Sequence, residues 1–303
     1  MLTSIRSRRY LVPVFFAMSF VLLIVAGFVW WNFIYQSPSR VFWGMMENNL
    51  QTSSVTKHIV GGANGQTVSQ YVRLQLGSTN ASQWLVTIKQ ADSKATTESI
   101  GTPKGDYVRY LELKAPANKK HADGSAYNFS SVINVWAKAD AGSTSAPQQL
   151  FSQTILDMIT APIPTPPIGN VSPENQQNIT KFMRDQTVFM PDYKTMQRKE
   201  LDGRKVYVYK VSVKLAPYIR MMQAFAHDVG LRDLDSIDPL QYQSAPPVKL
   251  IFTVDAAGHQ LRAVSNESQG YKQSYSDYGL TTPIQIPAKT ISFTELQTRL
   301  QKL

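Results

Sequence analysis

The hydrophobic pattern of the chain is dominated by one uninterrupted stretch near the N-terminus. Residues 11–31 carry no charged side chain and are almost all apolar. An α-helix rises 1.5 Å per residue, so a helix over this stretch would reach roughly 30 Å, the thickness of the hydrocarbon core of a bilayer. Trp30, Trp31 and Tyr35 lie at its end, where membrane helices carry interfacial aromatic residues. The pattern predicts a transmembrane helix within residues 11–35.

The charges around this stretch predict its orientation. Arg6, Arg8 and Arg9 precede it, and the first acidic residue of the chain is Glu47. Basic residues next to a membrane helix stay on the cytoplasmic side. Residues 1–10 are therefore expected to form a cytoplasmic basic tail, and the chain after the helix is expected to lie outside the cytoplasm.

The alternative for the N-terminal segment is a cleaved signal peptide. Signal peptides have shorter apolar regions and end in small residues at the cleavage site, whereas this stretch ends in the bulky residues Phe28-Val29-Trp30-Trp31. The sequence favours an uncleaved signal anchor over residues 11–35. This anchor would hold one extracytoplasmic domain, residues 36–303, at the cell membrane as a single-pass protein.

Behind the anchor, the pattern changes from a helical period to a strand period. Ser37-Pro38 begins a stretch with apolar residues at helical spacing that ends near Gln51, which predicts a short amphipathic helix. Apolar and polar residues then recur with strand character in five segments, which predicts an antiparallel meander with a hairpin turn at Asp123-Gly124. The predicted strands are residues 55–60, 68–76, 83–89, 106–114 and 127–137.

The middle of the chain is predicted to be helical on both sides of a Pro-rich connector. Helical periodicity follows Pro147 and includes Ile155. Residues 161–169 are rich in proline, which lacks the N–H group that a helix needs, so an exposed extended connector is predicted there. A further helix is predicted to begin at Pro173 and to turn Phe182 inward.

Hairpins return in the C-terminal part. Asp202-Gly203 lies between two strand-like segments and is the strongest hairpin signal in the chain. Pro217 opens a predicted helix with Phe225 on its inward face, a second hairpin turns at Ala257-Gly258, and Ser292-Phe-Thr-Glu295 is a capping box before a last helix. The predicted strands are residues 195–201, 204–213, 248–254, 261–266 and 271–278. This order of elements predicts an α+β fold built on a large antiparallel sheet.

The composition agrees with a folded outer domain. Apolar residues make up 43% and charged residues 17% of the 303 residues, which is typical of globular proteins. The net charge is +10, and a basic exterior can favour anionic polymers or lipid headgroups, although an evenly solvated surface explains the excess as well. No basic run is interleaved with aromatic residues, so no nucleic-acid partner is predicted.

Motifs that carry chemistry are scarce. The chain has no cysteine, which excludes disulfides, thiol catalysis and cysteine-based metal sites. None of the four histidines has the spacing of a metal motif, and the acidic cluster Asp233-Leu-Asp235-Ser-Ile-Asp238 lacks the spacing of an EF-hand. No nucleophile elbow and no phosphate-binding glycine loop occurs. We therefore expect no enzymatic activity, no metal and no cofactor.

Five Asn-x-Ser/Thr sequons occur in the chain. They would suggest N-glycosylation in a eukaryotic secretory protein, but chance is the favoured explanation in a chain rich in Ser, Thr and Asn. The sequons begin at Asn80, Asn128, Asn170, Asn178 and Asn266.

Three short motifs near the C-terminus carry a family resemblance. They are Val254-Asp255 followed by Gly258-His259, then Tyr275-Ser-Asp277-Tyr278-Gly279, then Ile284-Gln-Ile286-Pro287. With these motifs, residues 195–300 resemble the LolA-like and LppX/LprG-like envelope lipoproteins, whereas the part before them is similar only in the order of elements. The resemblance implies a strongly curved antiparallel half-barrel with helices over its concave face and a cavity for acylated lipids or lipoproteins. The chain departs from that family in having a transmembrane helix instead of a lipidated cysteine.

Two hypotheses about function follow. In the first, the outer domain binds or hands over a lipid or other apolar ligand in the cell envelope. In the second, it is a non-carrier interaction or structural module, with envelope proteins as partners and an interior filled by its own side chains. The first hypothesis requires an apolar cavity of several hundred Å³ between the sheet and the helices. The candidate lining residues are Trp84, Tyr110, Trp136, Phe182, Tyr209, Phe225 and Phe252.

Overall fold

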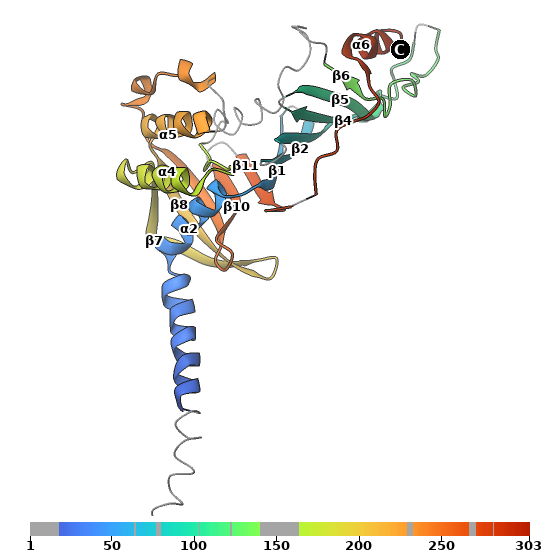
Figure 1. Ribbon diagram of the computed structural model, residues 1–303. Coiled ribbons are helices and arrows are strands. Elements are labelled where there is room, and N and C mark those ends of the chain that lie inside the picture. Colours follow the sequence, from blue (N-terminus) through green and yellow to red (C-terminus); the bar gives the residue numbers. More distant parts are fainter. Residues whose placement is uncertain are drawn as a thin grey trace, which may run out of the picture.

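The computed structural model describes most of the chain. The described residues are 18–63, 65–76, 80–102, 104–121, 123–139, 164–228, 233–266, 271–280 and 282–303. Among them, an apolar N-terminal helix leads into a domain built on one large curved sheet (Figure 1).

The sheet contains every strand that the structure describes. It is 12-stranded, in the order β12-β6-β5-β4-β3-β2-β1-β11-β10-β9-β8-β7. All its neighbouring strands are antiparallel except β12 and β6, which are parallel. The strands are β1 (Ser54–Ala63), β2 (Gln66–Gln75), β3 (Ala81–Gln90), β4 (Ser93–Thr102), β5 (Gly105–Lys114), β6 (Ala137–Lys138), β7 (Phe189–Leu201), β8 (Arg204–Val213), β9 (Val248–Asp255), β10 (Gln260–Asn266), β11 (Tyr271–Ser276) and β12 (Ile291–Ser292).

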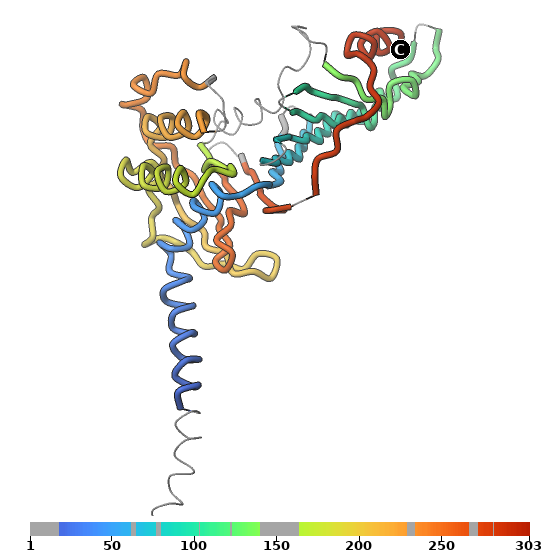
Figure 2. The backbone as a smooth tube through the Cα atoms, in the orientation of Figure 1, coloured from blue at the N-terminus to red at the C-terminus, as the bar shows by residue number. Residues whose placement is uncertain are grey.

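The fold class predicted from the sequence is confirmed: the chain is α+β, and its sheet is open and curved, like a half-barrel (Figure 2). Helices α2, α4 and α5 lie against the half of the sheet formed by β7 to β11, and we call the face on which they lie the inner face. The other half, β1 to β6, rises away from these helices, and α6 packs at its far end. The described helices of the domain are α2 (Pro38–Leu50), α4 (Pro173–Asp185), α5 (Leu215–Asp228) and α6 (Phe293–Gln301), with the short helices η2 (Asp233–Ser236) and η3 (Pro239–Tyr242).

The apolar helix at the N-terminus has the properties of a membrane span. The window Met18–Tyr35 has a mean hydropathy of 1.9, and none of it is buried against the rest of the protein. Its last part, η1 (Trp30–Tyr35), is a π-helix. Length and composition of this helix suit a membrane anchor and equally a signal sequence.

The helix is joined to the sheet through specific contacts. The hydroxyl of Tyr207 donates to the backbone oxygen of Gln36, and the Lys205 ammonium donates to its side-chain oxygen, both over 2.8 Å. Tyr35 donates from its hydroxyl to the backbone oxygen of Ala257 over 3.2 Å and stacks on His259 with the ring centroids 4.4 Å apart. The end of the apolar helix is therefore fixed beside the β9–β10 turn and the start of β8.

Below α2, α4 and α5 lies the main hydrophobic core. Phe42 from α2, Phe225 from α5 and Phe252 from β9 are fully buried in one cluster with Tyr207 and Tyr209 of β8. Successive side chains of a strand point to opposite faces of the sheet, so every second residue of β8 and β9 points into this core. Because the aromatic side chains interlock there, this half of the domain is held by packing without any disulfide.

Most of the predicted elements are confirmed. The helix from Pro38 ends at Leu50, the hairpin turns at Asp202-Gly203, and a second hairpin joins β9 to β10. Ser172 and Ser292 cap α4 and α6 by accepting from the backbone N–H groups of Asn175 and Glu295. The helix predicted after Pro147, with Ile155, lies outside the described residues.

The predicted meander was wrong in its last strand, and one of its strands was missed, whereas the strand predicted over 106–114 is confirmed as β5. Residues 93–102 form β4, which the sequence analysis missed, because Ser, Thr and Glu fill most of its positions. Residues 127–137 form turns and single bridges, and only Ala137–Lys138 pairs as β6. Asp123-Gly124 therefore does not join two long strands. Instead, the carboxylate of Asp123 accepts from the N–H and hydroxyl of Ser125 in a local turn.

The predicted exposure of the Pro-rich connector was also wrong for its described part. Residues 164–169 are not helical, as expected, but they are buried. The N–H of Gly169 donates to the backbone oxygen of Asn49 over 3.0 Å, and the backbone oxygen of Thr165 accepts from the Tyr218 hydroxyl over 2.9 Å. These bonds place the segment between α2 and α5, where two of its buried backbone groups find partners within the protein.

Candidate functional site

Strand register decides which side chains share the inner face. Val55 and Leu74 are paired and both belong to the main core. Two residues further along, Val72 pairs with Trp84. Side chains at a spacing of two lie on the same face of a strand, so Val72 and Trp84 face inward too.

The inner face of β2 and β3 carries an apolar strip. Val72 opposes Trp84, Val68 opposes Ile88, and Val86 lies between them on the same face of β3. Val72 is buried, Trp84 and Val86 are half-buried, and Ile88 is 37% exposed. We call these five residues the inner strip.

The inner strip lies between two packed clusters. One is the main core, whose edge residues in this region are Val55, Leu74 and Leu76. The other surrounds Val132, Ala137 and Leu296 and includes Tyr110 as a partly buried member. Among the described residues, no member of the inner strip belongs to either cluster. The strip is thus an apolar stretch of the inner face outside both clusters, buried at Val72 and exposed at Ile88.

Few polar groups adjoin the strip. Ser99 opposes Trp84, and Gln70 and Thr97 oppose Val86. Ser82 faces inward opposite Leu74, is fully buried, and its hydroxyl has no hydrogen-bond partner within the described part of the chain. An apolar surface with a few placed polar groups is typical of small-molecule and lipid sites.

The outer face of β1 to β5 carries a network of polar side chains and ring contacts. Arg109 donates to the carboxylate of Glu98 over 2.8 Å, and Gln83 donates to the other carboxylate oxygen over 2.6 Å. His58 and Tyr71 stack with centroids 4.0 Å apart. The outer face of these strands therefore carries a polar network beside the small cluster of Ala81, Ile100 and Ile284, and their inner face carries the apolar strip.

The structure brings together three of the seven residues expected to line a cavity. Tyr209, Phe225 and Phe252 are all fully buried in the main core. The Tyr209 hydroxyl donates to the backbone oxygen of Pro38 over 2.9 Å, and burial raises its pKa far above the ordinary value. Here the interior is occupied by the protein's own side chains, and a cavity role for these residues remains a prediction.

The other four candidates lie apart from one another. Trp84 belongs to the inner strip and Tyr110 lies at its far edge. Phe182 lines a groove of about 280 Å³ between α4 and α5. Trp136 packs in a separate cluster, and the guanidinium of Arg109 lies 4.6 Å from its ring centroid. Since Arg109 is on the outer face, Trp136 does not share a face with Trp84.

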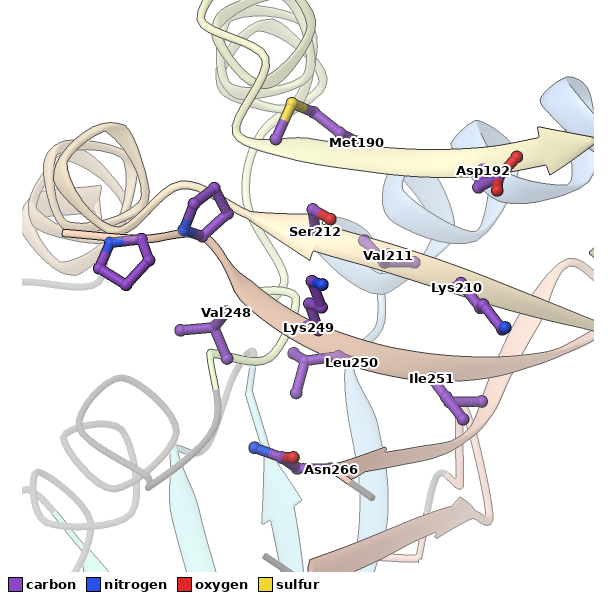
Figure 3. Close-up of a pocket in the computed structure, with 12 residues that line it drawn as sticks. Met190, Asp192, Lys210, Val211, Ser212, Val248, Lys249, Leu250, Ile251 and Asn266 are labelled. Carbon is purple, nitrogen blue, oxygen red and sulfur yellow. The ribbon is translucent and has the colours of Figure 1, made fainter. Parts of the chain in front are cut away.

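A larger pocket of about 720 Å³ lies at the ends of β7, β8 and β9. Figure 3 shows residues of these strands around it, among them Met190, Lys210 and Ile251. Lys210 pairs with Ile251, and both alternate with the buried Tyr209 and Phe252. Lys210 and Ile251 therefore lie on the outer face, away from the main core and from the inner strip.

A cluster of titratable groups lies at the β9–β10 turn. The Asp255 carboxylate accepts from the N–H groups of Ala257 and Gly258 over 2.9 and 2.8 Å, and from Arg262 over 3.2 Å. Burial by itself would raise the pKa of Asp255, but these donors together hold it below the ordinary value. Burial lowers the pKa of His259. Asp255 closes the turn, and the backbone oxygens of Gly258 and His259 accept from the Asn48 side chain of α2, each over 3.1 Å, so the role of this turn is structural.

The described residues contain no group of three or more His, Cys, Asp or Glu side chains that could hold a metal ion. His227 lies 2.6 Å from Asp235, but both side chains are more than one-third exposed. The expectations of no metal and no enzymatic activity are not tested by this.

Sequence reasoning missed Val72, Val86 and Ser82. Val72 and Val86 stood in segments that alternate apolar and polar residues, but the alternation did not show which face of the sheet the helices cover. Ser82 carries no sequence signal, because only its burial makes its hydroxyl unusual.

Comparison with known proteins gives no family. No family model matches the chain, and no curated protein does. Among solved structures, the crystal structure of LprF from Mycobacterium bovis is similar over 83% of this chain and 97% of that chain, with 14% sequence identity and a TM-score of 0.39. At this TM-score the likeness supports no argument about the chain.

Proposed function

We propose that this chain is a single-pass membrane protein whose outer domain binds a lipid or another apolar ligand on the inner strip. In this proposal, residues 1–10 lie in the cytoplasm, 11–35 form the anchor and 36–303 form the domain outside. The observation that carries the proposal is the inner strip itself, where Trp84, Val86 and Ile88 form a partly exposed apolar surface between two packed clusters.

The chemistry of the strip favours an acyl chain or a similar apolar group. Burial of apolar surface contributes about 25 cal/mol per Å², so a ligand that covers Trp84 and its neighbours gains affinity without a charged partner. The resemblance of residues 195–300 to envelope lipoproteins supports the same ligand class.

A second candidate function is a non-carrier envelope module. It is favoured by the filled interior under α2, α4 and α5, where Tyr209, Phe225 and Phe252 are fully buried. Such a module would bind envelope proteins and need no ligand. The two functions differ in whether the inner strip takes up an apolar molecule.

The test is ligand binding by the full chain purified from membranes in detergent. Organic extraction should recover a co-purifying lipid, and an environment-sensitive acyl probe should bind saturably. Trp84→Ser and Val86→Ser should each weaken probe binding, because they replace apolar contact surface with a hydroxyl. Ile251→Ser, on the outer face, is the matched control and should leave binding unchanged. Absence of both lipid and saturable binding would leave the non-carrier module as the function.

A further inference from the structure

The side of the domain next to the apolar helix carries a cluster of positive charge. Figure 1 shows the β7–β8 and β9–β10 turns on the side of the sheet from which this helix departs. The exposed basic residues there come from the start of α2 and from both arms of the β7–β8 hairpin. We call them the basic collar: Arg40, Arg198, Lys199, Arg204 and Lys205.

The collar is tied to the end of the apolar helix. Lys205 donates to the side chain of Gln36, the first residue after the helix window. Arg198 and Lys199 lie directly across the hairpin from Tyr207 and Val206. Tyr207 also donates to Gln36, so this whole stretch of the hairpin lies beside the point where the helix ends.

The charges of the collar are only partly compensated. Arg204 lies 3.5 Å from the Asp255 carboxylate, which also holds Arg262. The acidic residues of the hairpin tip are Glu200 and Asp202, which are fewer than the basic residues of the collar. A net positive surface within a Debye length of about 8 Å of anionic headgroups is attracted to them.

The hairpin also carries an exposed apolar residue at its tip. Leu201 is 45% exposed and stands directly before the turn formed by Asp202 and Gly203. Both turn residues have positive φ, 51° and 71°, which is the backbone of a tight two-residue hairpin. An apolar side chain on a stiff tip with cations around it matches the boundary between headgroups and acyl chains.

We propose that the basic collar binds anionic lipid headgroups of the membrane that the chain's own helix crosses, with Leu201 inserted at the headgroup level. The collar and the helix then hold the domain at two places, which fixes its orientation over the membrane. This inference rests on the proposed anchor but does not depend on the ligand of the inner strip.

The test uses the full chain reconstituted in nanodiscs. Because the chain has no cysteine, Leu201→Cys gives a single site for an environment-sensitive fluorophore. Two lipid compositions are compared, phosphatidylcholine alone and a mixture with about a quarter phosphatidylglycerol. In the anionic discs we expect a blue shift of the emission and loss of quenching by aqueous iodide. About 1 M NaCl should reverse both changes, because it shortens the Debye length to about 3 Å.

Charge variants test whether the basic collar causes the emission shift. Arg198→Gln together with Lys199→Gln should abolish the shift in anionic discs. Lys119→Gln together with Lys120→Gln makes the same change in net charge at exposed positions in the loop after β5, and it should leave the shift intact. A label on Ala288→Cys, exposed and in the other half of the domain, should report water in both lipid compositions.

The outcomes separate this inference from the proposed anchor. If the chain does not enter the nanodiscs at all, the anchor is refuted and the collar with it. If the chain enters and the Leu201→Cys label reports water in anionic discs, the collar proposal alone is refuted. An equal emission shift in both lipid compositions would show that headgroup charge is not its cause. An equal loss of the shift in the Lys119→Gln, Lys120→Gln variant would show that the collar does not recognise that charge specifically.

Discussion

The hydroxyl of Tyr207 donates a hydrogen bond to the backbone oxygen of Gln36 over 2.8 Å, and this contact joins the sheet to the end of the apolar helix. Both residues are buried. Tyr207→Phe removes the donor and leaves a buried carbonyl without this partner, so we expect a loss of about 1–3 kcal/mol in the free energy of unfolding. Urea unfolding of the full chain in detergent, followed by tryptophan fluorescence, measures this loss.

The same substitution at Tyr193 is the matched control. Tyr193 is 37% exposed and has ring contacts with Phe42 and Tyr209. Since its side chain reaches water, Tyr193→Phe should change the free energy of unfolding by about 0.5 kcal/mol or less. Equal effects at the two positions would mean that the bond to Gln36 contributes nothing specific.

Asp255 predicts a pH dependence of stability. Hydrogen bonds from Gly258, Ala257 and Arg262 hold its pKa below the ordinary value in the folded protein, despite burial that acts in the opposite direction. A carboxyl whose pKa is lower in the folded state stabilises the protein above its unfolded pKa of about 3.9 and loses that contribution as the pH falls through the folded pKa.

The comparison with Asp255→Asn isolates this contribution. At neutral pH the variant should unfold at a lower urea concentration, since it lacks the charge that Arg262 and Arg204 contact. As the pH falls below about 3.9 and on through the lower folded pKa, the two proteins should converge, because the wild-type carboxyl becomes neutral in the folded state as well. A difference in urea midpoint that stays constant from neutral to acid pH would contradict the assignment of the shift to Asp255.

Elements with strong local signals could be predicted from the sequence. Helix α2 begins at the proline and ends near Gln51 as expected, because an N-terminal proline and a regular apolar stripe define it locally. The hairpin at Asp202-Gly203 is equally local, since both positions require a positive φ. In contrast, β4 is a strand because it is paired between β3 and β5, and its own residues carry little strand signal.

The site was harder to predict than the fold. Trp84 was expected to line a cavity, with its face of the strand left open, and the register places it on the same face as the core residue Leu74. Trp136 was placed with it only because residues 127–137 were expected to be a strand. Since most of that segment is not paired, alternation there has no meaning, and the side chain packs on the outer face beside Arg109. Which strands the helices cover depends on tertiary packing and is not visible in a local pattern.

The buried connector gives a last prediction, at Gly169. A Cβ atom at this position would lie 2.6 Å from Cε2 of Phe225, closer than side chains tolerate. Gly169→Ala should therefore push Phe225 or the connector out of place and cost about 1–3 kcal/mol in the free energy of unfolding. Urea unfolding of the full chain in detergent measures it.

Two further variants show whether this close approach is the cause. Phe225→Leu removes the ring atoms that the new methyl group would meet, so Gly169→Ala should cost less in the Phe225→Leu background than in the wild type, an interaction that a double-mutant cycle measures. Gly61→Ala, at an exposed position of β1 with nothing within 4 Å of the new Cβ, is the control for adding a methyl group. Gly169→Ala could instead change the free energy of unfolding as little as Gly61→Ala. Residues 164–169 would then not be packed between α2 and α5, and the exposed connector predicted from the proline content would be correct.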